Sequence, residues 1–298
     1  MRERTIKAYQ LVDNSNRLPF IHSVKKEMAL SELSYQSRFL SSFIFGKNKQ
    51  QVELTARQFL LLRINTKQFN EKLLCSAAYE DVIEHELLIK EWRDILIKEG
   101  LKVNRFVSSV KFSFYIFKRL AYTLMSIGGL FVKAIRSSNK SVKTQKKYVQ
   151  FCDLNRNCLP WPGEEKEYTI VNWYINWDGS VKEIAEIHHN IPDKPAYHYK
   201  SFKISPANDF ICYLSGLRSW IKLISWLFCS FFIALFSLFR GHWINALLFH
   251  EAVLGKIISM LSPDCLAQEY LFSISSFSYR PFWTYIAEEK GSRITNYS

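Results

Sequence analysis

The chain has 298 residues, of which 48% are hydrophobic and 22% charged, and this length and balance allow a sizeable hydrophobic core. The polar N-terminus, MRERTIKAYQLVDNSNRLP, lacks the apolar segment of a secretory signal peptide. Six cysteines are scattered along the chain, and the closest pair, Cys152 and Cys158, fits no common zinc-binding spacing. We therefore expect reduced thiols in a cytoplasmic protein.

The net charge of +13 is concentrated in the N-terminal half. Residues 1–150 carry 27 Lys and Arg against 13 Asp and Glu, a net +14, whereas residues 151–298 carry 13 against 14, a net −1. Between Gly100 and Cys152 there are eleven basic residues and no acidic residue, which predicts an anionic partner. Because the basic residues alternate with Ile, Leu, Phe and Met, and no nucleic-acid-binding signature is present, the pattern disfavours nucleic acid.

Residues 51–100 are predicted to be helical, and residues 105–147 to form a basic, apolar helix with a basic tail. YEDVIEHELLIKEWRDILIKEG has the apolar spacing of an amphipathic helix that ends at Gly100. In the next segment the longest uncharged run, Leu120–Val132, is too short to span a bilayer. Its cations and the tail KSVKTQKK suit the surface of an anionic leaflet, and a buried helix with a solvated basic end fits the same pattern.

From residue 148 the sequence predicts a mixed, helix-rich α/β fold. KKYVQFCDL has the pattern of a strand, and the loop NRNCLPWPGEEKEYT, with two prolines and a glycine, follows it. Short strand-like and helix-like pieces then alternate, as in an α/β layer. We expect a helical, basic region over residues 1–147 and an α/β region over residues 148–298, with the boundary between residues 138 and 147.

Residues 208–261 predict long apolar helices inserted in the α/β region. The stretch LISWLFCSFFIALFSLF, residues 223–239, is uncharged, and in the following RGHWINALLFHEAVLGKIISML His250 and Glu251 interrupt an apolar helix. The uncharged stretch is at the lower limit for a membrane span. We expect a helix pair in the protein core or in the bilayer interface, with a true transmembrane span as the alternative.

The last segment, SISSFSYRPFWTYIAEEKGSRITNYS, predicts the end of a strand, a turn, an aromatic-faced helix that Gly291 terminates, and the start of another strand. Arg280 and Pro281 occupy the turn from strand to helix, with proline in the first helical turn. Ligands bind at the carboxyl ends of strands in α/β sheets, so Arg280 either holds a phosphate or carboxylate there or belongs to a surface turn.

Other candidates for chemistry are few. The sequence contains no G-x-G-x-x-G or G-x-x-x-x-G-K loop, no H-E-x-x-H, no G-x-S-x-G and no Asp-x-Asp, which counts against an ATPase, a zinc protease, an α/β-hydrolase and one class of metal-dependent sugar transferase. His188 and His189 end a predicted strand, where adjacent side chains face opposite ways, so at most one faces a given pocket. His250 and Glu251 form either an acid–base pair or a structural pair. Three aromatic residues are candidates for sugar stacking or for core packing: Trp173, Tyr174 and Trp177.

Three blocks of the chain together resemble a bacterial family of surface-polysaccharide biosynthesis proteins. They are YVQFCDLNRNCLPWPGEEKEYTIVNWYINW, LFSLFRGHWINALLFHEAVL and SSFSYRPFWTYIAEEKGSRI. The family is named for a Pro-Phe-Thr-Ser motif, occurs with O-antigen and capsule genes, and is regarded as containing glycosyltransferases of the GT-B kind, which have two Rossmann domains. The resemblance covers Tyr148 to Arg293, roughly half the chain, but the motif itself is missing, and the nearest fragment is Pro281-Phe282-Trp283-Thr284.

The resemblance implies transfer of a sugar from a nucleotide donor to a lipid-linked or surface-glycan acceptor, by a protein bound peripherally at the inner face of the bacterial membrane. It also implies partial GT-B-like Rossmann layers in a chain that ends before the Pro-Phe-Thr-Ser motif, at the start of an incomplete second Rossmann domain. Within these blocks the candidate catalytic residues are His250 and Glu251, and the candidate substrate-binding residues are Tyr279, Arg280 and His188. No metal or other cofactor is implied. The alternatives are a non-catalytic membrane-associated protein, as a split-gene partner or a truncated remnant, and a small integral membrane protein.

Overall fold

The computed structural model describes residues 6, 44, 97–98, 100, 102–137, 147–154, 158–160, 169–177, 184–191, 195–239, 244–273 and 280–297. Tyr279 and most of the helix predicted over residues 51–100 lie outside these ranges. Contacts divide the chain into two compact units. The first unit consists of Met1–Ile127 and Ile224–Val253, and the second of Gly128–Leu223 and Leu254–Ser298.

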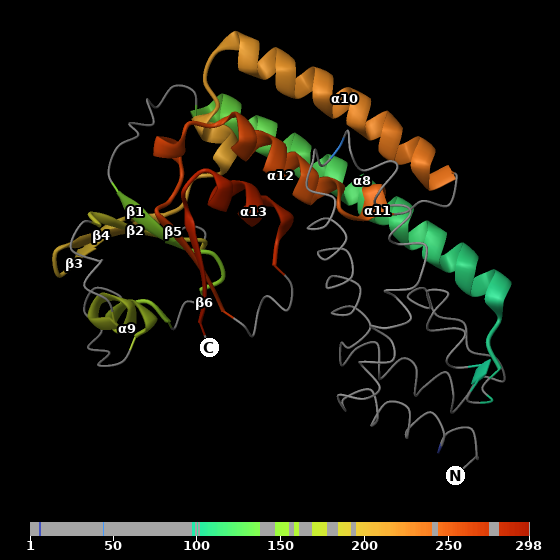
Figure 1. Cartoon of the computed structure of the whole chain (residues 1–298), viewed down its shortest axis with the longest axis horizontal. Helices are drawn as coiled ribbons and strands as arrows, with labels where there is room; N and C mark the ends of the chain where they lie inside the picture. Colours follow the sequence, from blue (N-terminus) through green and yellow to red (C-terminus); the bar gives the residue numbers. More distant parts are fainter. Residues whose placement is uncertain are drawn as a thin grey trace. The chain divides into compact units, whose positions relative to one another are not determined.

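Helices and strands alternate after residue 147, which confirms the predicted α/β class (Figure 1). The α-helices among the described residues are α8 (Arg105–Ser137), α9 (Ile170–Trp177), α10 (Leu217–Phe239), α11 (Ile244–Leu247), α12 (Phe249–Met260) and α13 (Phe282–Glu289). Two short 3-10 helices are η3 (Phe210–Tyr213) and η4 (Pro263–Cys265). The strands are β1 (Tyr148–Phe151), β2 (Glu186–His189), β3 (Tyr197–Tyr199), β4 (Phe202–Pro206), β5 (Glu269–Ser273) and β6 (Arg293–Tyr297).

The six strands form one sheet in the second unit, in the order β3-β4-β2-β1-β5-β6. Neighbouring strands are parallel, except that β3 is antiparallel to β4 at one edge. The chain starts at β1, adds β2 and β4 on one side, and then returns to add β5 and β6 on the other side of β1. This order is that of a doubly wound α/β sheet, in which the direction of strand addition reverses once.

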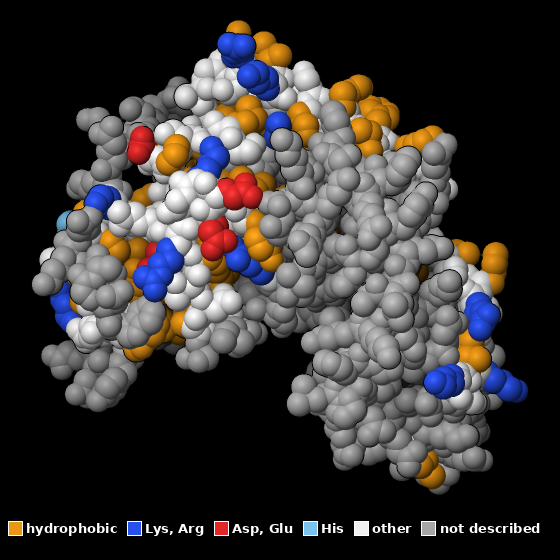
Figure 2. Space-filling model, viewed as in Figure 1, with side chains coloured by type: hydrophobic (Ala, Val, Ile, Leu, Met, Phe, Trp, Pro, Cys, Tyr) orange, Lys and Arg blue, Asp and Glu red, His pale blue; other side chains and the backbone are white. Residues whose placement is uncertain are grey.

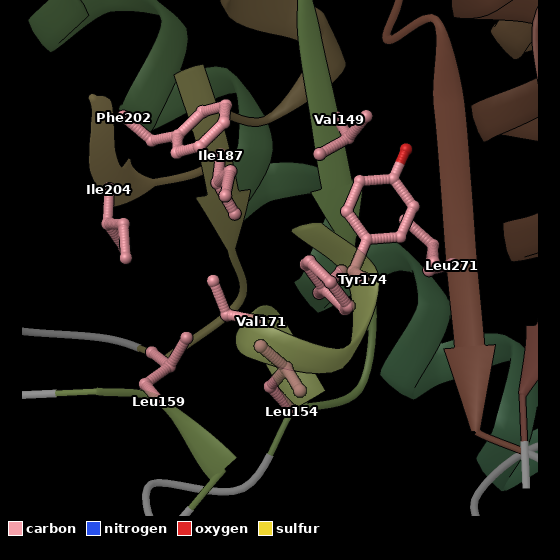
Figure 3. Packing of buried hydrophobic residues seen from close by; sticks show 10 residues of the cluster. Val149, Leu154, Leu159, Val171, Tyr174, Ile187, Phe202, Ile204 and Leu271 are labelled. Atoms are coloured by element: carbon pink, nitrogen blue, oxygen red, sulfur yellow. The ribbon is translucent and has the colours of Figure 1, made fainter. Parts of the chain in front are cut away.

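The central strands are buried because helices cover both faces of the sheet. Three of the four residues of β1 and four of the five residues of β5 are buried, as expected for parallel strands with two covered faces. On one face Val171 and Tyr174 of α9 belong to the same buried cluster as Val149 of β1 and Leu271 of β5, and Figure 3 shows Tyr174 between these two strand residues. The buried cluster on this face consists of Val149, Phe151, Leu154, Leu159, Val171, Tyr174, Ile187, Phe202, Ile204 and Leu271.

The opposite face of the sheet is covered by α13. Side chains alternate between faces along a strand, so Tyr270 and Phe272 of β5 point away from α9. The ring of Trp283 in α13 contacts both of them, with centroid distances of 5.1 Å to Tyr270 and 5.9 Å to Phe272. The two crossovers, β1–α9–β2 and β5–α13–β6, therefore place their helices on opposite faces, as two right-handed connections running in opposite directions from the centre require.

The predicted strand, helix, glycine stop and strand at the end of the chain are confirmed. After β5 and α13, Gly291 has φ of 98°, a left-handed conformation that glycine adopts without strain, and β6 begins two residues later. Gly255 of α12 serves a different purpose, close approach to α13. A Cβ atom built on Gly255 would lie 2.7 Å from Cδ1 of Ile286, so a side chain there requires Ile286 to move.

The first unit contains helical segments that fall within the stretches predicted as helical, residues 105–147 and 208–261. The rings of Phe117 in α8 and Phe239 in α10 meet edge to face at 5.7 Å, and Nδ2 of Asn245 in α11 donates a hydrogen bond to Oγ of Ser237 at 3.3 Å. Five of the cysteines fall within the described residues, and none of these five forms a disulfide with another: Cys152, Cys158, Cys212, Cys229 and Cys265.

Candidate functional site

The direction of strand addition reverses between β1 and β5, and doubly wound sheets bind ligands outside the carboxyl ends of the strands at that point. The segments that leave these two ends lead to α9 on one face and to α13 on the other. A ligand bound at this point would contact the residues at and just after the ends of β1, β5 and β6.

Asp153 is the acidic residue at this edge, two residues after the end of β1. Its Oδ2 accepts a hydrogen bond from the backbone N–H of Ser273, the last residue of β5, at 2.7 Å. Its Oδ1 accepts a hydrogen bond from the hydroxyl of Tyr297, the last residue of β6, at 3.3 Å. Burial, and secondarily the charge of Asp153, raise the pKa of Tyr297, so the phenol stays neutral and donates. One half-buried carboxylate thus ties together the ends of three strands.

A second carboxylate, Glu269 at the start of β5, has a structural role. It is 5% exposed, and its Oε2 accepts a hydrogen bond from the hydroxyl of Tyr174 at 2.6 Å. Its Oε1 accepts from the hydroxyl of Thr295 and lies 3.5 Å from Nε of Arg293. These donors satisfy the buried charge, so this carboxylate fastens α9 and β6 to β5.

The predicted aromatic group over residues 173–177 does not act as one surface. Tyr174 is buried in the core beneath α9, whereas Trp173 is 39% exposed, with its ring centroid 6.3 Å from that of Tyr297. The side chain of Trp177 lies outside the described residues. Of the two members whose side chains are described, Trp173 is the exposed one, and it lies close to Tyr297, which donates a hydrogen bond to Asp153.

His188 and His189 face opposite sides of the sheet, as the strand pattern predicted. The ring of His188 stacks on Tyr148 at 4.3 Å, and its Nε2 lies 3.1 Å from Oε2 of Glu186. On the other face, Nδ1 of His189 accepts a hydrogen bond from the backbone N–H of Ile191 at 3.2 Å. Burial lowers the pKa of both imidazoles, for His189 to about 4, so both are neutral at neutral pH. His188, the candidate for substrate contact, is buried in its stack.

Arg280 follows β5 along the chain and begins the approach to α13, as predicted, and its guanidinium lies along that helix. Its Nε donates a hydrogen bond to Oγ1 of Thr284 at 3.0 Å, and its Nη2 forms an ion pair with Oε2 of Glu288 at 2.5 Å. The guanidinium carbon lies 3.9 Å from the centroid of the Tyr285 ring. Tyr279, the neighbouring candidate, lies outside the described residues. Arg280 therefore contacts α13 through three side chains.

His250 and Glu251 are half-buried neighbours in α12 and belong to the first unit, whereas Asp153 and Arg280 belong to the second. Successive residues of a helix point about 100° apart, so these two side chains leave α12 in different directions. Burial, and secondarily the charge of Arg119, lower the pKa of His250, which is neutral at neutral pH and able to accept a proton.

The described residues were compared with the requirements of a metal site and of a membrane-spanning helix. No three of the described His, Cys, Asp and Glu side chains lie close enough together to hold a metal ion. Within the same ranges, α10 is the helix whose length and composition would allow it to cross a membrane.

Comparison with known proteins gives one match. A family model described as "Polysaccharide biosynthesis PFTS motif protein" matches residues 226–298, which include most of α10 and all of α12, β5, α13 and β6. No curated protein and no solved structure matches the chain. The match supports the predicted resemblance and a role in polysaccharide biosynthesis. His250, Glu251 and Arg280 lie within the matched residues, and Asp153 and His188 lie before them.

Proposed function

We propose that this protein is a glycosyltransferase of polysaccharide biosynthesis that takes its sugar from a nucleotide donor, with the second unit as a GT-B-like Rossmann layer. The observation that carries the proposal is the reversal of the doubly wound sheet between β1 and β5, at which the carboxylate of Asp153 joins the ends of β1, β5 and β6. Sheets of this order bind nucleotides outside the carboxyl ends of their strands at that point. The match to a polysaccharide biosynthesis family is consistent with a sugar nucleotide as the ligand.

The groups at this edge suit the chemistry of such a donor. A carboxylate accepts hydrogen bonds from hydroxyl groups, and Asp153, at the ends of β1, β5 and β6, is the proposed acceptor for hydroxyl groups of a ribose or a sugar. Trp173, partly exposed beside Tyr297, offers an aromatic face for a sugar or a base. Arg280 would bind a phosphate of the donor if its guanidinium exchanged the Glu288 carboxylate for that phosphate, because guanidinium groups form bidentate pairs with both carboxylates and phosphates.

His250 is the proposed proton acceptor for transfer. In the reaction an acceptor hydroxyl oxygen forms a bond to the anomeric carbon of the donor, and the bond from that carbon to the diphosphate oxygen breaks with its electron pair on the diphosphate. The proton of the hydroxyl must go to a base. A neutral imidazole with a lowered pKa, as in His250, can take it.

The test is a hydrolysis and transfer assay of the purified full chain with a panel of nucleotide sugars, with binding measured in parallel by calorimetry. We expect saturable binding of at least one donor, lost in Asp153→Ala and retained in the exposed control His198→Asn. We expect His250→Gln to bind the donor and to lose turnover. Binding without turnover in the wild type would instead indicate a non-catalytic donor-binding protein. No binding and no turnover with any donor would contradict the proposal.

A further inference from the structure

One face of α10 is a continuous stripe of large apolar side chains exposed to solvent. Its members follow one another at spacings of three or four residues, which places them on the same side of the helix. We define the α10 stripe as Leu217, Ile221, Ile224, Phe228, Phe232, Phe236 and Phe239, which are between 50% and 77% exposed. Monomeric soluble proteins rarely leave so many large apolar side chains together in water, so the stripe is expected to have an occupant.

The opposite side of α10 is packed against protein, and it combines small residues with the buried Leu223 and Leu238. Ser230, Ala234 and Ser237 are fully buried. Ser237 donates a hydrogen bond to the carbonyl oxygen of Ile233 at 2.6 Å and accepts one from Asn245 of α11 at 3.3 Å. A helix with one protein-facing side and one apolar exposed side matches the pattern of a helix that lies in the plane of a membrane interface.

The basic residues of α10 and α8 favour an anionic partner for the α10 stripe. α10 contains no acidic residue, and Arg218 and Lys222 are exposed in its first two turns. α8 contains no acidic residue in its 33 residues, and Lys111 and Lys118 are exposed on it, close in sequence to the exposed Phe114. In Figure 2 hydrophobic side chains follow the helix labelled α10 in Figure 1, with Lys or Arg side chains near its first turn.

We propose that α10 lies flat in the interface of an anionic lipid bilayer, with the α10 stripe inserted among the acyl chains and the cations of α10 and α8 at the headgroups. Transfer of the exposed phenylalanine and isoleucine side chains from water into the bilayer lowers the free energy. Each lysine or arginine near an anionic leaflet adds to the electrostatic attraction between protein and membrane. A second copy of the chain is disfavoured as the occupant because it would bring like charges together. This inference does not depend on the proposed enzymatic activity.

The first test is sedimentation of the full chain with lipid vesicles. We expect binding to vesicles of phosphatidylcholine with about one third phosphatidylglycerol, and weaker binding to phosphatidylcholine alone or at high salt. Phe228→Ser, Phe232→Ser and Phe236→Ser combined should lower the partition coefficient by about tenfold or more, because burial of each ring contributes. The single variant Phe232→Ser is expected to weaken binding, and the exposed control His198→Asn on β3 is expected to leave it unchanged.

The second test measures depth in the membrane. Nitroxide labels on single cysteines at residues 221, 228 and 236, in a chain whose native cysteines are replaced, report their immersion by relaxation with oxygen and a water-soluble nickel complex. Equal, shallow depths at the three positions support a helix in the plane, whereas depths that pass through the bilayer centre would overturn the proposal in favour of a transmembrane span. Absence of vesicle binding, or stripe variants that change the oligomeric state of the free protein, would also overturn it.

Discussion

The carboxylate of Asp153 accepts a hydrogen bond at 2.7 Å from the backbone N–H of Ser273, 120 residues further along the chain. This contact joins the end of β1 to the end of β5, where strand addition changes direction. Ser273 is the last residue of β5, so the contact holds the carboxyl ends of β1 and β5 next to each other. The proposed ligand edge is thus shaped by a long-range polar contact.

Replacing Asp153 with alanine should lower the free energy of unfolding by about 1–3 kcal/mol, because the N–H of Ser273 and the hydroxyl of Tyr297 both lose their acceptor. Tyr297→Phe removes the longer of the two hydrogen bonds alone and should cost about 1 kcal/mol or less. Urea denaturation of the two variants and the wild type measures both values. An Asp153→Ala variant as stable as the wild type would show that the contact contributes nothing.

Stability should fall as the pH is lowered, and His189 should account for a large part of the loss. Burial holds the pKa of this imidazole at about 4, below its ordinary value of 6.5, so the unfolded chain binds the proton more tightly. The contribution of His189 to the free energy of unfolding is therefore fully present above about pH 6.5 and declines toward pH 4, with about 2 kcal/mol lost at pH 5. His189→Asn, whose side-chain oxygen can replace Nδ1 as acceptor for Ile191, should show a smaller decline in urea denaturation. His198→Asn on β3 is the exposed control, and an unchanged decline in His189→Asn would refute the assignment.

Gly255 should be coupled energetically to Ile286. Alanine in a helix is normally about 1 kcal/mol more favourable than glycine, but here its Cβ would lie 2.7 Å from Cδ1 of Ile286. We expect Gly255→Ala alone to be neutral or destabilising. Ile286→Val removes the methyl group that the new Cβ would meet. The double variant should therefore have a free energy of unfolding about 1 kcal/mol higher than the two single changes add up to. Thermal or urea unfolding of the four proteins measures the coupling, and strict additivity would rule out a close approach of α12 to α13 at this point.

Variants of Arg280 and Glu288 should show whether Arg280 serves only in a structural ion pair or also contacts the ligand. Its pair with Glu288 is partly exposed, so Arg280→Met and Glu288→Gln should each cost about 0.5 kcal/mol of stability, with a coupling energy of similar size. If Arg280 binds the phosphates of the donor, Arg280→Met weakens nucleotide-sugar binding at least about tenfold, whereas Glu288→Gln, which releases the guanidinium, preserves or strengthens it. Equal binding by both variants would confine Arg280 to its contacts along α13.

The elements that the sequence predicted well are those with strong local signals. β1 and β5 are short runs with mostly apolar residues in their centres, next to turn residues. Gly291 follows the aromatic helix where a left-handed residue is needed. The segment over residues 168–177 carried no such signal, since its β-branched and aromatic residues have a low helix propensity. Packing of Val171 and Tyr174 onto the sheet explains why this segment is helical as α9.

The candidate site was harder to predict because its contacts are long-range. Asp153 was visible as the acidic residue after a predicted strand, but its partners lie 120 and 144 residues away and depend on the strand order. Arg280 was placed correctly at the approach to α13. Its contacts with Thr284 and Glu288, four and eight residues on, follow helical spacing and were in principle readable from the sequence.

The most direct test of the proposed function is the position at which a donor binds. The full chain is irradiated with a photoreactive nucleoside diphosphate sugar, and the modified residues are mapped by mass spectrometry, with unlabelled donor as competitor. We expect competed adducts in the segments that follow β1 and β5, residues 152–160 and 273–281, and we expect both to be lost in Asp153→Ala. Competed adducts confined to other parts of the chain, or no competed adduct with any donor that the protein hydrolyses or binds, would contradict it.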